Sequence, residues 1–563
     1  MSDQHAAGFY RLIDGRPAVV FGDRRLTAFY SETFPRGFHK RNLQMAEAGV
    51  EVFMLIVRGG YEDDFNTTWF WRDDGVYGDE SDRPDDLTLD RQAETLLRAS
   101  PDALFMVRWG SEAPLRWSAK HPDELQASAR GRRRDSTYAS RRAAEGRAEM
   151  ARRIVRYAES RPWGERLIGY MPFGQDEGTP NLICSDALFD ESPAMLREFR
   201  RFLKETYGTD AALRKAWNDP AATLAAAAPP TDAEWTTARA RWMHWPEPRE
   251  TRRYRDYFLT VRGLLIYQRR LELGAVKEAT RRPVFTGTDA LKQPMYGWLI
   301  QDAFEGANIG MTFRNLKLGS GSSNVGPLLD APELDTLITP ADYTARSCGF
   351  AWEPEGIGDS LVLRGKTIFV EDDARSWACA ESGTQGAWRT VEECRAGLMR
   401  NLVIAASRGF IPYWMNVGSG YFDDPDVLKA VAEQIPVRRR LLSLPHAHTE
   451  HAIAMVIDDE SSLDEDFTSG FQNLAVLRQR TDALGLTGLP YRIFLLSDLE
   501  RDNFPVFRAY LLPNLFRLTP ARAALIRQKL MRNGSMIICG PGTGLSDGAQ
   551  LTAGPASDLL GLP

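Results

Sequence analysis

The chain is poor in the residues that build metal centres and disulfide bonds. Only five of its 563 residues are cysteines, and no two of them form a Cys-x-x-Cys pair. The seven histidines likewise show no His-Glu-x-x-His spacing or similar metal-binding pattern. These absences argue against a disulfide framework and against a zinc site. We therefore predict reduced thiols, no metal ion and no cofactor.

A long apolar run and a strong excess of one charge are also missing. No stretch reaches the roughly 18 apolar residues that a membrane-spanning helix needs. The first residues lack the basic and apolar parts of a signal peptide. The net charge of -6 and the pI near 5.8 give no reason to expect nucleic acid as a partner. The sequence predicts a soluble cytoplasmic protein that binds neither a membrane nor a nucleic acid.

The chain is long and contains many tryptophans. Its 563 residues exceed what one hydrophobic core usually supports, so we expect two or more domains. Hydrophobic residues make up 43% and charged residues 26%, as is ordinary for a globular protein. Fourteen tryptophans are present. Their rings can stack on the flat faces of sugars, although most tryptophans in large enzymes lie in cores or interfaces.

Apolar strand-like runs alternate with helical patterns along residues 1–440. The run at 50–57, for example, is continuous and apolar, as expected for a strand buried on both faces. Eight strands alternating with helices predict a (β/α)8 TIM barrel with an insertion around residues 180–250. The predicted strands are 26–30, 50–57, 103–107, 167–173, 283–286, 334–338, 367–370 and 410–415.

The pattern restarts in residues 450–563 with four short strands. Two helices, at 473–485 and 520–533, are predicted between them, so we expect a smaller, doubly wound α/β domain. The glycines at 540–544 resemble a phosphate loop but lack the following Lys-Ser/Thr, which makes nucleotide binding a weak alternative. The predicted strands are 451–457, 491–496, 509–512 and 534–539.

Acidic residues follow two of the predicted barrel strands. The strand at 367–370 runs directly into the carboxylates of residues 371–373, and the strand at 167–173 is followed by Asp176 and Glu177. A loop that caps the next helix is the simpler explanation for either segment taken alone. In (β/α)8 barrels, however, the carboxyl ends of the strands form the catalytic face. Two carboxyl groups about 5 to 5.5 Å apart are what a retaining glycosidase requires.

Four further segments carry a family resemblance. They are residues 68–77, rich in tryptophan, residues 190–217, and residues 511–519 and 532–537 near the end of the chain. Together they resemble glycoside hydrolase family 42 and related β-galactosidase-like glycosidases of clan A, over nearly the whole chain. The last two segments resemble the trimerisation domain of that family. Asp176 departs from the pattern, since the family usually has asparagine before its acid/base glutamate.

The resemblance implies a retaining exo-β-glycosidase, most simply a β-galactosidase, that removes terminal sugars by double displacement. Glu371 matches the nucleophile, with Arg375 and secondarily Arg108 keeping it ionised. Glu177 matches the acid/base residue, and Asp176 is the fallback. The implied partners are an oligosaccharide or glycoside substrate and further copies of the chain, with a trimer suggested by the second domain.

Polar and aromatic residues at the strand ends are candidates for binding the sugar. Asp289 and Asn416 are expected to bind hydroxyl groups, and the aromatic rings to form walls of the site. For each aromatic residue, ordinary core packing is an equal alternative. The candidates are Trp69, Trp71, Arg108, Trp109, Asp176, Asp289, Tyr343, Arg375, Trp414 and Asn416.

Two alternatives for the function stay open at this point. The same pair of carboxyl groups would also suit another glycone, such as a galactofuranoside, an arabinoside or a fucoside. The unusual segment at residues 174–178 would also fit a barrel that binds carbohydrate without hydrolysing it.

Overall fold

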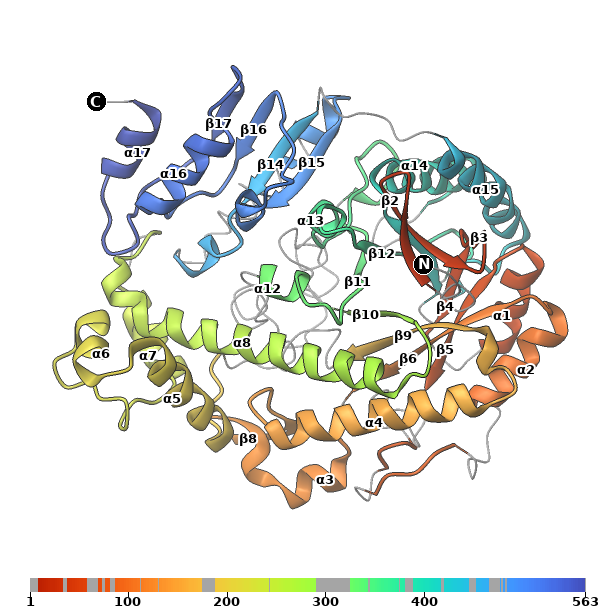
Figure 1. Cartoon of the computed structure of the whole chain (residues 1–563), viewed down its shortest axis with the longest axis horizontal. Coiled ribbons are helices and arrows are strands. Elements are labelled where there is room, and N and C mark those ends of the chain that lie inside the picture. The colour runs from red at the N-terminus through yellow and green to blue at the C-terminus, as the bar shows by residue number, and fades with distance from the viewer. Residues whose placement is uncertain are drawn as a thin grey trace.

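The computed structural model shows a strand barrel ringed by helices, with a second α/β unit beside it (Figure 1). The residues that it describes are 9–33, 38–57, 69–72, 76–80, 87–111, 113–129, 131–174, 188–241, 244–289, 325–342, 345–373, 375–379, 388–416, 420–444, 452–464, 476, 479–480 and 483–561.

Eight parallel strands close into the barrel. Each strand pairs with the next one along the chain, and the last strand pairs with the first through Asn416 opposite Glu32. This pairing confirms the predicted fold class and the predicted order of the eight strands. The strands are β4 (Phe29–Glu32), β5 (Val52–Val57), β6 (Leu104–Gly110), β9 (Leu167–Gly174), β10 (Phe285–Asp289), β11 (Thr336–Pro340), β12 (Thr367–Asp372) and β13 (Ile411–Asn416).

Side chains along each barrel strand alternate between the interior and the surrounding helices. On β12, Phe369 lies in the interior cluster, whereas Ile368 and Val370 pack outward. Val19, from the hairpin of β1 (Phe9–Ile13) and β2 (Arg16–Phe21), joins the interior cluster. The interior is thus filled with side chains, and a ligand has to bind at the ends of the strands.

Helices cover the outside of the barrel, and α4 and α8 run side by side along one flank (Figure 1). Thr88, Ser140 and Thr390 begin α2, α4 and α14, because each side chain accepts a hydrogen bond from a backbone N–H of the first turn. Within the described residues, no helix combines the length and apolar character that a membrane span requires. The helices are α1 (Phe38–Glu47), α2 (Leu89–Ala99), α3 (Leu115–Lys120), α4 (Arg141–Ser160), α8 (Pro248–Ala279), α12 (Gly326–Leu329), α13 (Gly358–Leu363), α14 (Val391–Arg408) and α15 (Pro425–Ser443).

Extra helices stand between β9 and β10, inside the span where an insertion was expected. They are α5 (Pro193–Tyr207), α6 (Asp210–Trp217) and α7 (Asp232–Arg239). Phe199 and Trp235 of these helices pack with Tyr257 of α8 in a separate hydrophobic cluster. This insertion therefore has its own small core, on the flank of the barrel formed by α8.

The second unit is a four-stranded parallel sheet in the order β15-β14-β16-β17. This order, in which the first strand lies between the second and the third, is that of a doubly wound fold and agrees with the prediction. Most of the helix predicted at 473–485 lies outside the described residues. The elements are β14 (Ile453–Ile457), β15 (Tyr491–Leu495), β16 (Ala509–Leu512), α16 (Pro520–Lys529), β17 (Met536–Cys539) and α17 (Gly554–Leu560).

The barrel and the second unit share one hydrophobic cluster. Leu337 and Ile368 of the barrel belong to the same buried cluster as Met455 and Leu495 of the second sheet. The hydroxyl of Ser360 in α13 donates a 2.5 Å hydrogen bond to Oδ2 of Asp498, which follows β15. The two units are therefore packed together through a dry core as well as through polar contacts.

Candidate active site

Glu371 projects into the barrel at the carboxyl end of β12. It has the same orientation as Phe369 in the interior cluster, whereas Asp372 faces outward and accepts a 3.0 Å hydrogen bond from Asn401 of α14. The Glu371 side chain is 14% exposed. Its carboxylate thus lies at the mouth of the barrel, where solvent and a ligand can reach it.

Two donors from other strands converge on one oxygen of Glu371. The hydroxyl of Tyr413 on β13 donates a 2.7 Å hydrogen bond to Oε1, and Nη2 of Arg108 on β6 lies 3.5 Å from the same atom. Burial, followed by the charge of Glu371, raises the pKa of Tyr413 well above its ordinary value. Tyr413 therefore stays a neutral donor, and both contacts favour the carboxylate form of Glu371.

Asp289, at the end of β10, binds the same guanidinium group. Nη2 of Arg108 donates a 2.8 Å hydrogen bond to its Oδ2. Its side chain is only 8% exposed, and burial raises its pKa from 3.8 to about 7. Arg108 opposes this shift, and the charge of Glu371 adds to it. Arg108 thus links Asp289 and Glu371 across the barrel mouth.

Arg375 lies in the loop after β12, where it contacts Asp373 and Tyr421. Its Nη1 lies 3.1 Å from Oδ2 of Asp373, and its guanidinium lies 4.8 Å from the ring centre of Tyr421. Asp373 is also bound by Arg346, at 2.5 Å. Arg375 therefore holds the loop after β12, whereas Arg108 is the cation that lies directly beside Glu371 among the described residues.

Solved structures with the same architecture include several glycosidases. A β-galactosidase from Bacillus circulans sp. alkalophilus matches with a TM-score of 0.64 and 14% identity, over 94% of this chain and 73% of that chain. A GH42 β-galactosidase from G. stearothermophilus matches at 0.63 and 12%, over 97% and 74%. This chain therefore has the fold of a family 42 β-galactosidase. An exo-carrageenase GH42 from Bacteroides ovatus matches at 0.56 and 11%, over 98% and 69%. No protein-family model matches the chain, and no curated protein matches its sequence.

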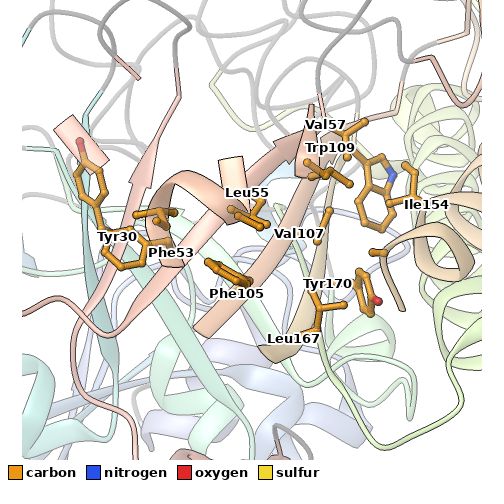
Figure 2. Packing of buried hydrophobic residues seen from close by; sticks show 14 of the residues in the cluster. Tyr30, Phe53, Leu55, Val57, Phe105, Val107, Trp109, Ile154, Leu167 and Tyr170 are labelled. Carbon is orange, nitrogen blue, oxygen red and sulfur yellow. The ribbon is translucent and has the colours of Figure 1, made fainter. Parts of the chain in front are cut away.

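Trp109 and Trp71 lie on the outer side of the barrel. Because Arg108 faces the interior, its neighbour Trp109 faces the helices, and Figure 2 shows it beside Ile154 of α4. The Trp109 indole donates a 3.2 Å hydrogen bond to Glu272 of α8. Trp71 is 1% exposed and belongs to the same cluster. The expectation that these two rings form walls of a sugar site does not fit their positions, and we leave them out of the proposed site.

Trp414 and Asn416 also face away from the interior. Trp414 belongs to the outer cluster. Nδ2 of Asn416 donates to both carboxylate oxygens of Glu32, at 3.0 and 2.8 Å, and its Oδ1 accepts from the backbone N–H of Tyr421. Asn416 thus joins the first and last strands of the barrel. Both the NH₂ group and the oxygen of its amide are already hydrogen-bonded within the protein. The residue of β13 that binds Glu371 is Tyr413, which the sequence reasoning missed.

The structure describes one of the four remaining predicted residues, Trp69. Trp69 is half-buried, and the guanidinium of Arg72 lies 5.8 Å from its ring centre. Asp176, Glu177 and Tyr343 lie outside the described residues. Within the described part of the chain, no group of three His, Cys, Asp or Glu side chains is arranged to hold a metal ion.

Proposed function

We propose that the chain is a retaining exo-β-glycosidase, most simply a β-galactosidase. The observation that carries the proposal is Glu371, which lies at the mouth of a β-galactosidase-like barrel with Tyr413 and Arg108 on one of its oxygens. Glu371 attacks the anomeric carbon and forms a glycosyl ester, while Glu177 gives its proton to the leaving oxygen. Water then cleaves the ester with Glu177 as base, and the configuration is retained. Asp176 is the alternative acid.

The two hydrogen-bond donors on Glu371 orient its carboxylate for attack and stabilise it when it is released. Tyr413 and Arg108 come from β13 and β6, two strands of the closed barrel that hold both donors at the same carboxylate oxygen. A carboxylate fixed in this way loses little freedom when it attacks, which lowers the barrier. The same donors stabilise Glu371 when it leaves the ester as a carboxylate in the second step.

The nucleophile is tested by removing and then replacing its carboxylate. We expect Glu371→Ala to lower turnover of a nitrophenyl β-galactoside by on the order of 10⁴-fold, and added azide to restore turnover with a glycosyl azide as product. Asp372→Asn is the matched control, since Asp372 faces α14 on the other side of the same strand. A Glu371→Ala enzyme that gives no glycosyl azide, while the control stays active, would contradict the role of Glu371.

The glycone is tested with a panel of substrates. Nitrophenyl β-galactopyranoside, galactofuranoside, arabinoside and fucoside separate the sugars that this pair of carboxyl groups could accept. Carrageenan oligosaccharides belong in the panel because an exo-carrageenase shares the fold. We expect the highest kcat/KM for the β-galactopyranoside.

We further propose that the second unit joins copies of the chain, with a trimer as the expected assembly. The edge strand β17 exposes Met536 at 61% and Ile538 at 44%, and an edge strand with exposed apolar side chains favours association. Light scattering of a Met536→Lys, Ile538→Lys double variant should show a lower mass than the wild type. Val76→Lys, at an exposed apolar residue of the barrel region, is the control. A wild type that is already monomeric would remove the proposal.

We also propose that the chain works in a reducing compartment, the cytoplasm. The four described cysteines are free thiols, and two of them are buried. Microscopy of a fluorescent fusion in the native host would test the location, and a signal outside the cytoplasm would contradict it.

A further inference from the structure

A single guanidinium nitrogen serves two carboxyl groups at the barrel mouth. Nη2 of Arg108 lies 2.8 Å from Oδ2 of Asp289 and 3.5 Å from Oε1 of Glu371. The three side chains are 5%, 8% and 14% exposed, respectively. If both carboxyl groups were ionised, these three side chains would together carry one positive and two negative charges. When two carboxylates share such a site, the pKa of one of them is raised and that group keeps a proton.

The geometry indicates which carboxyl group keeps the proton. Glu371 is the more exposed of the two and receives the hydroxyl of Tyr413, and both features favour its ionised form. Asp289 is more buried, and its raised pKa of about 7 agrees with its being the protonated group. Its Oδ2 accepts from Arg108, whereas its buried Oδ1 has no hydrogen-bond partner among the described residues. The proton is therefore placed on Oδ1.

Among the described residues, the charged and titratable groups that act on Asp289 come from four elements. Arg108 faces it from β6, Glu371 from β12, Tyr413 from β13, and Arg269 acts on it from α8. The neighbouring strands β9 and β11 contribute no charged side chain, and the β11 residue paired with Asp289 is the apolar Ile338. Apart from burial, the protonation of Asp289 thus depends on Arg108 and on whether Glu371 carries its charge.

We propose that Asp289 balances the charge of Glu371 during turnover, an inference that rests on Glu371 being the nucleophile. Asp289 carries a proton on Oδ1 while Glu371 is a carboxylate. When Glu371 bonds to the anomeric carbon and the bond to the leaving group breaks, the site loses one negative charge. Asp289 then releases its proton to solvent, so that Arg108 keeps an anionic partner. When water cleaves the ester, the Glu371 carboxylate re-forms and Asp289 takes up a proton again.

Proton release on trapping of the ester tests this proposal directly. The probe is a dinitrophenyl 2-deoxy-2-fluoro-β-galactoside, whose leaving group departs as an anion without needing a proton. The protons released are counted with an indicator dye in weak buffer, at a pH below the pKa of Asp289, and the adduct on Glu371 is counted by mass spectrometry. We expect Asp289→Asn to release nearly one proton fewer per adduct than the wild type.

Asp372→Asn is the matched control for this measurement. Asp372 is also a buried carboxyl group with a pKa raised by burial, to about 6, but it faces Asn401 outside the barrel. The control should release as many protons as the wild type. Equal release from wild type and Asp289→Asn, or an equal deficit in Asp372→Asn, overturns the proposal.

A second readout covers the case in which Asp289→Asn does not fold or does not form the adduct. Infrared difference spectra of a Glu177→Gln variant, which lacks the acid/base carboxyl group, should show on trapping the loss of a carboxylic-acid carbonyl band besides the gain of the ester carbonyl band. An unchanged carboxylic-acid band overturns the role of Asp289. Absence of any adduct on wild-type Glu371 is a different result, because it contradicts the proposed nucleophile itself.

Discussion

At the residue scale, burial of Asp289 makes the stability of the fold depend on pH. Its pKa is raised from 3.8 to about 7, so the folded chain holds a proton that the unfolded chain gives up at lower pH. The stabilisation is present below the ordinary pKa and is lost as the pH rises through about 7. Asp289→Asn stays neutral, so the unfolding free energy of the variant relative to that of the wild type should rise by about 4 kcal/mol as the pH rises through this window. Urea denaturation of both proteins at several pH values measures it, and a constant difference would contradict it.

The hydroxyl of Tyr413 should matter for catalysis but little for folding. Tyr413→Phe keeps the ring in the interior and removes the 2.7 Å hydrogen bond to Glu371 together with a weak 3.7 Å contact to the sulfur of Met415. A hydrogen bond to a charged group contributes about 1.5 to 3 kcal/mol, so we expect kcat/KM to fall by roughly 10- to 100-fold. Tyr170→Phe is the control, because Tyr170 packs on the outer side of β9. Equal activity of the two variants would contradict the assignment of Tyr413.

The direction in which each strand residue faces could be predicted only in part. Strands buried on both faces show no alternation of apolar and polar residues, so nothing in β13 indicates that Tyr413 faces inward and Trp414 outward. On β6 a signal was present. A charged Arg108 in the apolar layer between strands and helices would be costly, so it has to face the mouth, and Trp109 must then face the helices.

At the element scale, the close approach of α4 to the segment at residues 69–72 depends on a glycine. A Cβ at Gly146 would lie 2.4 Å from the ring of Trp71, so any side chain there pushes the helix away. We expect Gly146→Val to destabilise the fold by about 1 to 3 kcal/mol. Gly263 of α8 has no atom within 4 Å of its Cβ position, and Gly263→Ala should stabilise by about 0.5 to 1 kcal/mol. Thermal unfolding of both variants checks the opposite signs, and a stable Gly146→Val would contradict the packing argument.

The eight strands could be found from sequence because each contains a short apolar run, but the carboxyl ends of most of them could not. The run at 103–107 was extended by the structure to Gly110, and the run at 367–370 was extended to Asp372. In both cases the added residues are polar or follow a charged side chain, because they form the mouth of the barrel. The apolar pattern therefore stops where the candidate site begins.

At the scale of the whole molecule, the shared hydrophobic cluster should make the two units unfold together. Leu495 lies in the shared cluster, and Leu518 lies in the separate cluster of the second unit; both are fully buried. Truncating either to alanine should cost about 2 to 5 kcal/mol. If the units are coupled, both variants shift one common transition, with activity and helix content lost at the same temperature. Two separate transitions, with only the Leu495→Ala variant affecting activity, would contradict the coupling.

The docking of the two units could not be predicted from sequence. The apolar runs predict both sheets, and each sheet needs a partner for its buried face. Leu337 and Met455, which lie in the shared cluster, are more than a hundred residues apart, and no local pattern relates them. Only the packed structure shows that one cluster serves both units.

The pairing of β4 with β13 also has a consequence for how the chain is made. Asn416 binds Glu32, a residue 384 positions earlier in the chain. Until β13 has been synthesised, β4 has only β5 as a neighbour, and one edge of the growing sheet is open. Synthesis adds about 5 to 20 residues per second, so this edge stays unpaired for roughly tens of seconds. The nascent chain therefore needs protection from pairing with other chains, and slower expression at low temperature should raise its soluble yield.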